Sequence, residues 1–148
     1  MSLNSFLTSA KFLIEIQNYD TALCLLCCVI DSCAKKKYPS KGNADRIKLW
    51  VNDNIDAISS HGLPAIFGKN CKFCFGHEIK HLKANENGYA GIEDIIYYLI
   101  RCCLVHECDI DRHIMLVPQN VFTYTNNKII LPHTLCNGLI YAISQNIT

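Results

Sequence analysis

Residues 92–107 read IEDIIYYLIRCCLVHE, and this stretch decides the fold that the sequence predicts. Apolar positions recur along it at intervals of three or four, the spacing that lines one face of an α-helix. The stripe comprises Ile92, Ile95, Ile96, Leu99, Cys103 and His106. The sequence therefore predicts a helix here, with His106 on its apolar face.

Two polar side chains of this helix could together act on a phosphate group. Arg101 has a planar, permanently charged group that fits phosphate oxygens, and His106 can exchange protons near neutral pH. Five helical positions place their attachment points about 140° apart. One helix cannot bring the two side chains together, whereas a second copy of the helix could. The alternative is structural: a core histidine, and an arginine paired with Glu107 or Asp94.

The segments before residue 92 also follow helical spacing. We expect a first helix containing residues 6–16, a second over about 21–37, and a third from Asn43 or Asp45 to residue 61. Residues 67–88 are less regular, and we expect a short helix between loops there. The second and third helices are bounded by the turn residues of the sequence, proline, glycine and asparagine.

Residues 113–130 have the composition of strands. Segments 113–117 and 121–130 are rich in β-branched and aromatic residues and surround Pro118 and the pair Asn126-Asn127, which predicts a small strand pair. Pro132 suits the first turn of a closing helix. The fold class predicted is all-α: an up-and-down helical bundle with a small appended β-hairpin before the last helix, forming a single domain over residues 1–148.

Composition excludes several classes of protein. Hydrophobic residues make up 50% of the chain and charged residues 18%, which is typical of a compact, ordered protein. A net charge of +1 excludes a protein that coats nucleic acid electrostatically. The apolar run over residues 22–30 is shorter than the ~20 residues that span a bilayer, so we expect no membrane segment.

The cysteines indicate a reducing compartment. The chain has ten, and six lie inside apolar segments, where thiols behave as small buried hydrophobic groups. The first residues lack a basic leader followed by a long apolar run, so we expect no secretory signal. The expected localisation is therefore cytoplasmic.

Four possible zinc ligands lie close together in the sequence. Cys71, Cys74, His77 and His81 form C-x2-C-x2-H-x3-H. The pattern lacks the intervening stretch, about twelve residues in common zinc fingers, that lets two ligand pairs approach a metal from different directions. We interpret it as a partly buried loop with incidental thiols, and expect no metal and no cofactor; a zinc site is the alternative.

Two further groups have a functional and a structural interpretation. Lys35, Lys36 and Lys37 could bind nucleic acid, but positive charge at a helix C-terminus is also favoured by the helix dipole. Cys102 or Cys103 could form a nucleophilic pair with His106, but apolar surroundings favour buried, inert thiols.

The segment Arg101-Cys102-Cys103-Leu104-Val105-His106 resembles the signature of the HEPN domains, an arginine followed after four to six residues by a histidine near the end of one helix. The order of elements is similar too, over about residues 22–108. An early apolar helix carries an acidic residue (LLCCVIDSCAKKKYP), and a tryptophan-containing helix follows (IKLWVNDNI).

The resemblance implies a helical protein that dimerises through its motif-bearing helices. Active members are metal-independent endoribonucleases, many of them toxins or defence proteins. Arg101 and His106 of both copies would then form the catalytic site, with Cys102 and Glu107 as supporting residues. The partners implied are a second copy, RNA, and an antitoxin or a nucleotidyltransferase-like protein.

One residue departs from the pattern of active members. They usually carry asparagine, aspartate or histidine immediately after the arginine, whereas this chain has Cys102, and a thiol is a weak hydrogen-bond donor. A non-catalytic HEPN-like module that binds RNA or nucleotides, or only dimerises, is therefore the alternative function.

Overall fold

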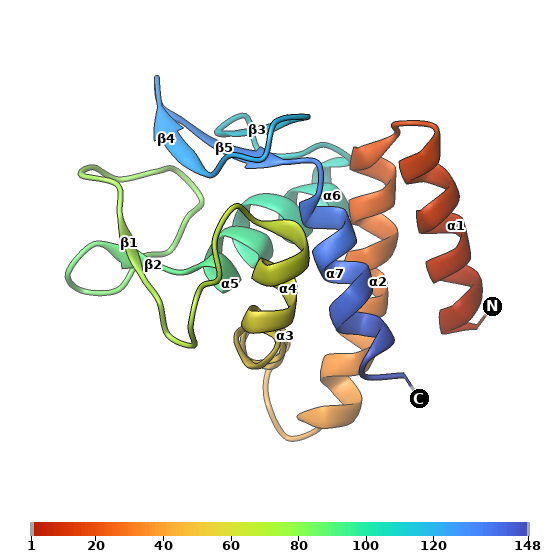
Figure 1. Ribbon diagram of the computed structural model, residues 1–148. Helices are drawn as coiled ribbons and strands as arrows, with labels where there is room; N and C mark the ends of the chain where they lie inside the picture. The colour runs from red at the N-terminus through yellow and green to blue at the C-terminus, as the bar shows by residue number, and fades with distance from the viewer. Residues whose placement is uncertain (1, 148) are drawn as a thin grey trace.

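The computed structural model describes residues 2–147 and contains both helices and sheets (Figure 1). The helices are α1 (Leu3–Glu15), α2 (Tyr19–Lys37), α3 (Asn43–Asp53), α4 (Ile55–Gly62), α5 (Ile92–Asp94), the π-helix η1 (Ile95–Arg101), α6 (Cys102–Glu107) and α7 (Leu135–Ser144). Helices dominate, but two small sheets make the chain a mixed α/β protein. The predicted all-α fold class is therefore wrong.

The first two predicted helices are confirmed, and their starts are set by local hydrogen bonds. The Ser2 hydroxyl accepts a hydrogen bond from the Ser5 N–H at the start of α1. The Asn18 side chain accepts one from the Thr21 N–H at the start of α2. Between the two helices Gln17 adopts a left-handed backbone conformation with φ of 62°. The chain can therefore reverse sharply there, and α1 packs along α2.

The third predicted helix is divided in two at Asn54. The Asn54 backbone N–H bonds to the carbonyls of Trp50 and Val51, and its side-chain amide donates to Trp50 O over 2.8 Å. These contacts end α3 at Asp53, and α4 begins at Ile55. The asparagine side chain competes in this way with regular helical hydrogen bonding. The spacing of apolar residues does not reveal such a break.

A buried hydroxyl ties α4 to the chain that follows it. Ser59 Oγ donates to Ile55 O over 2.6 Å and accepts from the Phe67 N–H over 3.0 Å. We expect Ser59→Ala to lower the free energy of unfolding by about 1–3 kcal/mol, because the Phe67 N–H loses its partner. Denaturant unfolding measures this. Ser60→Ala, at an exposed neighbour, is the control, and equal losses in both variants would contradict the assignment.

Residues 92–107 form one continuous helical segment, as predicted, but its middle is wider than an α-helix. Over η1 each backbone hydrogen bond joins residues five positions apart in the sequence, as at its end, where the Cys102 N–H bonds to Tyr97 O. Apolar spacing does not reveal this change. Ile95, Ile96 and Leu99 are buried as expected, whereas His106 lies off the apolar stripe and is exposed.

The helix expected within residues 67–88 is absent from the described chain. That region is a long loop joined by two short antiparallel strands, β1 (Phe73–Cys74) and β2 (Tyr89–Ala90). Asn70 and His81 have positive φ, as do two glycines, Gly76 and Gly88. Repeated left-handed residues do not continue a right-handed helix, so a loop forms instead.

The second sheet differs from the predicted strand pair. It contains β3 (Ile114–Val117), β4 (Thr123–Thr125) and β5 (Lys128–Pro132) in the order β3-β5-β4. β4 and β5 form an antiparallel hairpin around Asn126 and Asn127, both with positive φ, as hairpin turns prefer. β3 instead pairs in parallel with β5. Pro132 accordingly ends β5, and α7 begins three residues later.

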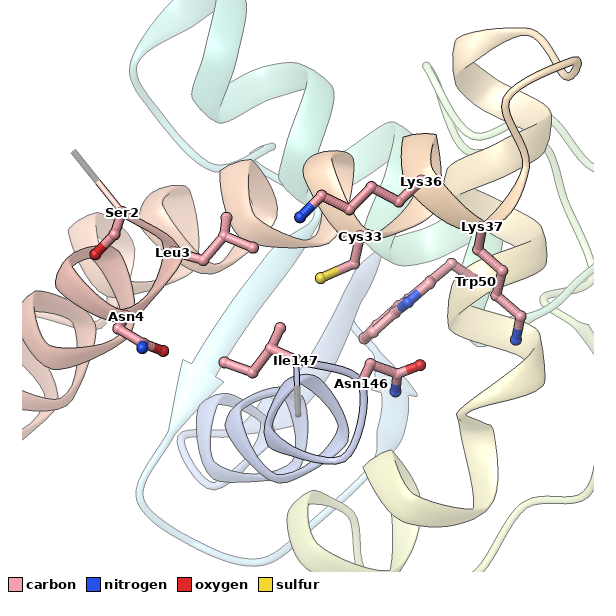
Figure 2. Close-up of a pocket in the computed structure, with 9 residues that line it drawn as sticks. All are labelled: Ser2, Leu3, Asn4, Cys33, Lys36, Lys37, Trp50, Asn146 and Ile147. Carbon is pink, nitrogen blue, oxygen red and sulfur yellow. The ribbon is translucent and has the colours of Figure 1, made fainter.

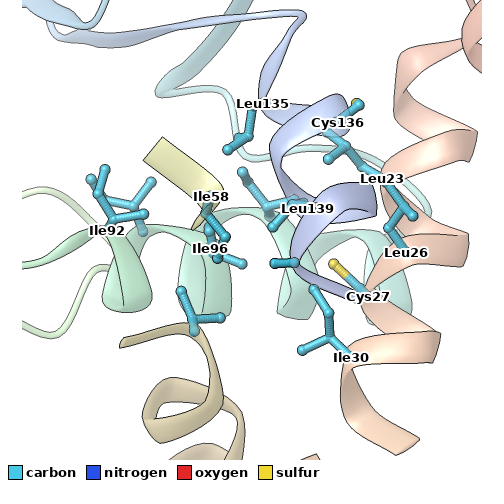
Figure 3. Close-up of a cluster of buried hydrophobic side chains, with 14 of the residues drawn as sticks. Leu23, Leu26, Cys27, Ile30, Ile58, Ile92, Ile96, Leu135, Cys136 and Leu139 are labelled. Atoms are coloured by element: carbon cyan, nitrogen blue, oxygen red, sulfur yellow. The ribbon is translucent and has the colours of Figure 1, made fainter. Parts of the chain in front are cut away.

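The core lies between α2, α4, the 92–107 segment and α7 (Figure 3). Its largest fully buried side chains include Trp50, Leu23, Leu26, Ile30, Ile58, Ile96 and Leu99. α4 and α7 approach closely because Gly62 and Gly138 face each other. Figure 1 shows the three-stranded sheet across one end of the helices, with β1 and β2 on the side away from α1. None of the helices described over residues 2–147 is long and apolar enough to cross a membrane.

Candidate functional site

Arg101 is held in place by an acidic residue of another helix. Its Nη2 donates to Asp31 Oδ2 on α2 over 2.8 Å, and only 12% of the Arg101 side chain is exposed. Burial alone would lower the pKa of Arg101, but the hydrogen bond and charge of Asp31 raise it. The guanidinium carbon lies 5.7 Å from the centre of the Tyr97 ring. Arg101 is therefore a permanent cation with a fixed position.

The expected partners of Arg101 are occupied or exposed elsewhere. Asp94 pairs with Lys48 over 3.5 Å and with Lys72 over 3.3 Å, and Glu107 lies exposed at the end of α6. The structural alternative, in which Arg101 pairs with one of them, is therefore wrong. Asp31 is 70 positions away in the sequence, so helical spacing could not have found it.

One hydrogen-bond donor of Arg101 has no acceptor. Arg101 Nε is buried and lacks a hydrogen-bond partner among residues 2–147, as does Asp31 Oδ1. A buried unpaired donor costs free energy and needs a physical reason. A ligand or a second copy that approached this position could accept the hydrogen bond.

His106 lies on the surface near the end of α6 and is not enclosed by Leu99 and Cys103. Both of those residues are buried, whereas the imidazole faces solvent. The core interpretation of His106 is therefore wrong. No hydrogen bond or ion pair joins His106 to Arg101 within the described chain. The lack of a contact within one chain agrees with the angle of about 140° between their positions on a helix.

The thiols near Arg101 are poor nucleophiles. Burial and the neighbouring charge of Asp31 raise the pKa of Cys28, and burial raises the pKa of Cys27 still further. Burial also raises the pKa of Cys103 to about 11, with Asp111 and Glu107 adding to the effect. At neutral pH these groups are protonated. A nucleophilic pair of Cys103 with His106 therefore has little thiolate available.

The three lysines at the end of α2 point to different places. Lys37 pairs with Asp53 over 2.9 Å. Lys36, Lys37 and Cys33 line a pocket of 550 Å³ together with residues 2–4 and 146–147, and Figure 2 shows Lys36 lying along α2 while Lys37 reaches past Trp50. Lys35 is exposed one helical turn after Asp31, on the Arg101 side of α2. Only Lys35 is therefore positioned to add positive charge near Arg101.

The four candidate zinc ligands of the 67–88 loop do not converge. His77 bonds to the hydroxyl of Tyr124, whereas His81 bonds to Asp111 over 3.0 Å. Within residues 2–147 the only cluster with ligand atoms close enough for a metal is His81, Cys103 and Asp111, all within 4.8 Å of one another. Sequence reasoning included His81 but missed Asp111, because the two residues belong to separate loops.

Asp111 is the centre of a polar network. The Asp111 Oδ1 atom accepts from the backbone N–H of His113 over 2.8 Å and lies 2.7 Å from His113 Nδ1. Burial alone would raise the pKa of Asp111, but the hydrogen bonds from His113 and His81 outweigh it and lower the pKa. The buried side chain is therefore a carboxylate. A pair of histidines around one aspartate is visible in the sequence only as Asp111-x-His113.

Comparison with known proteins finds a matching family. The family model described as Rv1289 matches residues 6–144 of the chain. No curated protein matches, and no solved structure matches. The match spans both Arg101 and His106 as well as the Asp111 network.

Proposed function

The chain belongs to the Rv1289 family, and we propose that it is a metal-independent endoribonuclease that acts as a homodimer. Arg101 and His106 of both copies form the site. The observation that carries the proposal is the exposure of His106 on the same helical segment as a positioned Arg101. The order of residues that resembles HEPN domains supports it, although the two sheets depart from an all-helical bundle.

Arg101 is suited to bind a phosphate. Asp31 fixes one end of the guanidinium, which lowers the entropy lost when a ligand binds. The buried Nε has no acceptor among the described residues and can donate to a phosphoryl oxygen. In the proposed reaction the fixed charge stabilises the negative charge that develops on the phosphate.

His106 is suited to move protons. As a base it accepts the proton of a ribose 2′-hydroxyl, whose oxygen attacks the neighbouring phosphorus atom. The bond to the 5′-oxygen breaks, and that oxygen takes a proton from water, while the proton held by His106 returns to solvent. The products are a 2′,3′-cyclic phosphate and a 5′-hydroxyl. The reaction needs neither a metal nor a thiolate.

A twofold interface would bring together Arg101 and His106, which lie too far apart around one helix to meet within a single chain. An isologous contact places the same surface of two copies face to face, so Arg101 of one copy can approach His106 of the other. The α2 and α6 surface next to Arg101 supplies uncharged side chains for such a contact: Cys28 is exposed, and Val105 is 42% exposed. Lys35 at its edge adds positive charge for RNA.

The test is cleavage of single-stranded RNA by the purified full chain in the presence of a chelator. We expect fragments that end in a 2′,3′-cyclic phosphate, made by a species with the mass of a dimer. Circular dichroism in the same buffer shows that the fold persists without metal. A pure dimer that cleaves none of a broad set of RNAs would remove the nuclease proposal.

A non-catalytic binding module is the second candidate, and one observation favours it. Arg101 already donates to Asp31, and the next residue, Cys102, is a weak hydrogen-bond donor in the position where active HEPN members carry a stronger one. Binding of RNA or nucleotides without turnover would identify this function.

The wider setting follows from the resemblance. A toxin or defence role with an antitoxin or nucleotidyltransferase-like partner is part of the proposal. So is a cytoplasmic location, which the ten free cysteines support.

A further inference from the structure

Three separate segments bring possible metal ligands together behind α6. Cys103 comes from α6, His81 from the 67–88 loop, and Asp111 from the loop before β3. Asp111 Oδ2 lies 3.0 Å from His81 Nδ1 and 3.8 Å from Cys103 Sγ. When donor atoms each lie about 2.0–2.3 Å from one tetrahedral metal, the distances between the donor atoms are close to the two found here.

The positions of the ligands are determined by their surroundings. The Asp111 N–H bonds to Leu99 O over 3.1 Å, which ties its loop to the 92–107 segment. His113 holds Asp111 Oδ1 through its backbone and its ring, so Oδ2 faces the other two ligands. Hydrogen bonds of this kind, made by residues that do not bind the metal themselves, orient metal ligands in known sites.

The His81 loop is also fixed. Buried Ile79 and half-buried Leu82 pack on the core on either side of the histidine. His81 itself has a φ of 72°, a left-handed conformation that costs free energy for a residue other than glycine. The surrounding contacts keep its ring against Asp111.

The cluster has an open side. A pocket of 320 Å³ is lined by His81, Asp111 and His113 together with Glu107, Lys80 and Arg112. Cys103 is buried, whereas 47% of the His81 side chain is exposed. A metal held by three ligands at this border would keep one coordination position for water or a small ligand, as catalytic zinc sites do.

We propose that His81, Cys103 and Asp111 bind one divalent transition-metal cation of the zinc class, with His113 as a positioning residue and the fourth position open to the pocket. The combination of imidazole, thiolate and carboxylate favours zinc over magnesium or calcium, which prefer oxygen ligands alone. The cation replaces the proton of the Cys103 thiol and balances the buried Asp111 carboxylate. The proposed metal site is independent of the proposed RNA cleavage.

The test is titration of the full, metal-free chain with Co²⁺ and then with Zn²⁺. We expect one cobalt per chain and a thiolate-to-cobalt charge-transfer band that Zn²⁺ abolishes by displacement. His81→Ala should remove stoichiometric binding, and its exposed position makes it the variant that perturbs the fold least. Cys103→Ala should remove the charge-transfer band. His113→Ala should weaken binding by about 10- to 100-fold.

Two variants in the neighbouring loop serve as matched controls. His77→Ala and Cys74→Ala remove the same residue types outside the cluster and should leave cobalt binding unchanged. Circular dichroism of each variant reports the fold. The proposal is overturned if the wild-type chain shows no thiolate band, or if Cys74→Ala abolishes the band while folded Cys103→Ala keeps it.

Discussion

Arg101→Ala should reduce RNA cleavage by at least about 100- to 1000-fold, because it removes the charge that stabilises the transition state. His106→Ala should reduce it by about 100- to 10,000-fold, because proton transfer is lost. Single-turnover rates on one RNA measure both effects. Arg101→Lys should also be impaired, since lysine keeps the charge but loses the planar fork that binds phosphate at two atoms.

These variants need controls for fold and assembly. Arg101→Ala leaves Asp31 half-buried without its partner, so its unfolding and its dimer mass are measured beside its activity. His61→Ala is the matched histidine control: His61 is exposed on α4 and stacks on Tyr141 at 3.5 Å between ring centres. Folded, dimeric Arg101→Ala or His106→Ala that cleaves at the wild-type rate would contradict the assigned roles.

Gly138→Ala should destabilise the chain by about 3 kcal/mol or more, because α7 has no room for a side chain at this position. A Cβ on Gly138 would lie 2.3 Å from Ile58 O and 2.9 Å from Gly62 Cα, both backbone atoms of α4. The substitution therefore forces two helices apart. The gain in helix propensity from glycine to alanine is only about 1 kcal/mol.

Denaturant unfolding measures the effect of Gly138→Ala. Gly68→Ala is the matched control, since a Cβ there meets nothing within 4 Å and the residue does not have a positive φ. A Gly138→Ala protein as stable as the Gly68→Ala protein would show that α4 and α7 are not in the close contact described.

The features that the sequence predicts correctly are local. Helix α2 and the helical segment of residues 92–107 follow from apolar spacing, which depends on neighbours three and four positions away. That spacing reveals neither the π-helical turn over η1 nor the exposure of His106, which it placed on the apolar stripe. The turn residues Asn126 and Asn127 are a local signal too, but the predicted pairing of 113–117 with 121–130 missed the hairpin that β4 and β5 form there.

The features that the sequence did not predict depend on distant contacts. β3 pairs in parallel with β5 rather than with the segment that follows β3, and Val117 lies opposite Pro132 at the ends of the two strands. The partner of Arg101 comes from α2, and the partner of Asp111 from the 67–88 loop. Arg101 and His106 were identified as candidates from the sequence, whereas the Asp111 cluster needed the three-dimensional arrangement.

The most direct test of the composite site is to mix two inactive proteins. Arg101→Ala and His106→Ala dimers are combined, allowed to exchange subunits, and assayed on RNA. Half of the dimers are then mixed, and each holds one intact arginine-histidine pair across the interface, so we expect roughly a quarter of the wild-type rate. If exchange is complete by mass and no cleavage returns, the two residues do not act across a dimer.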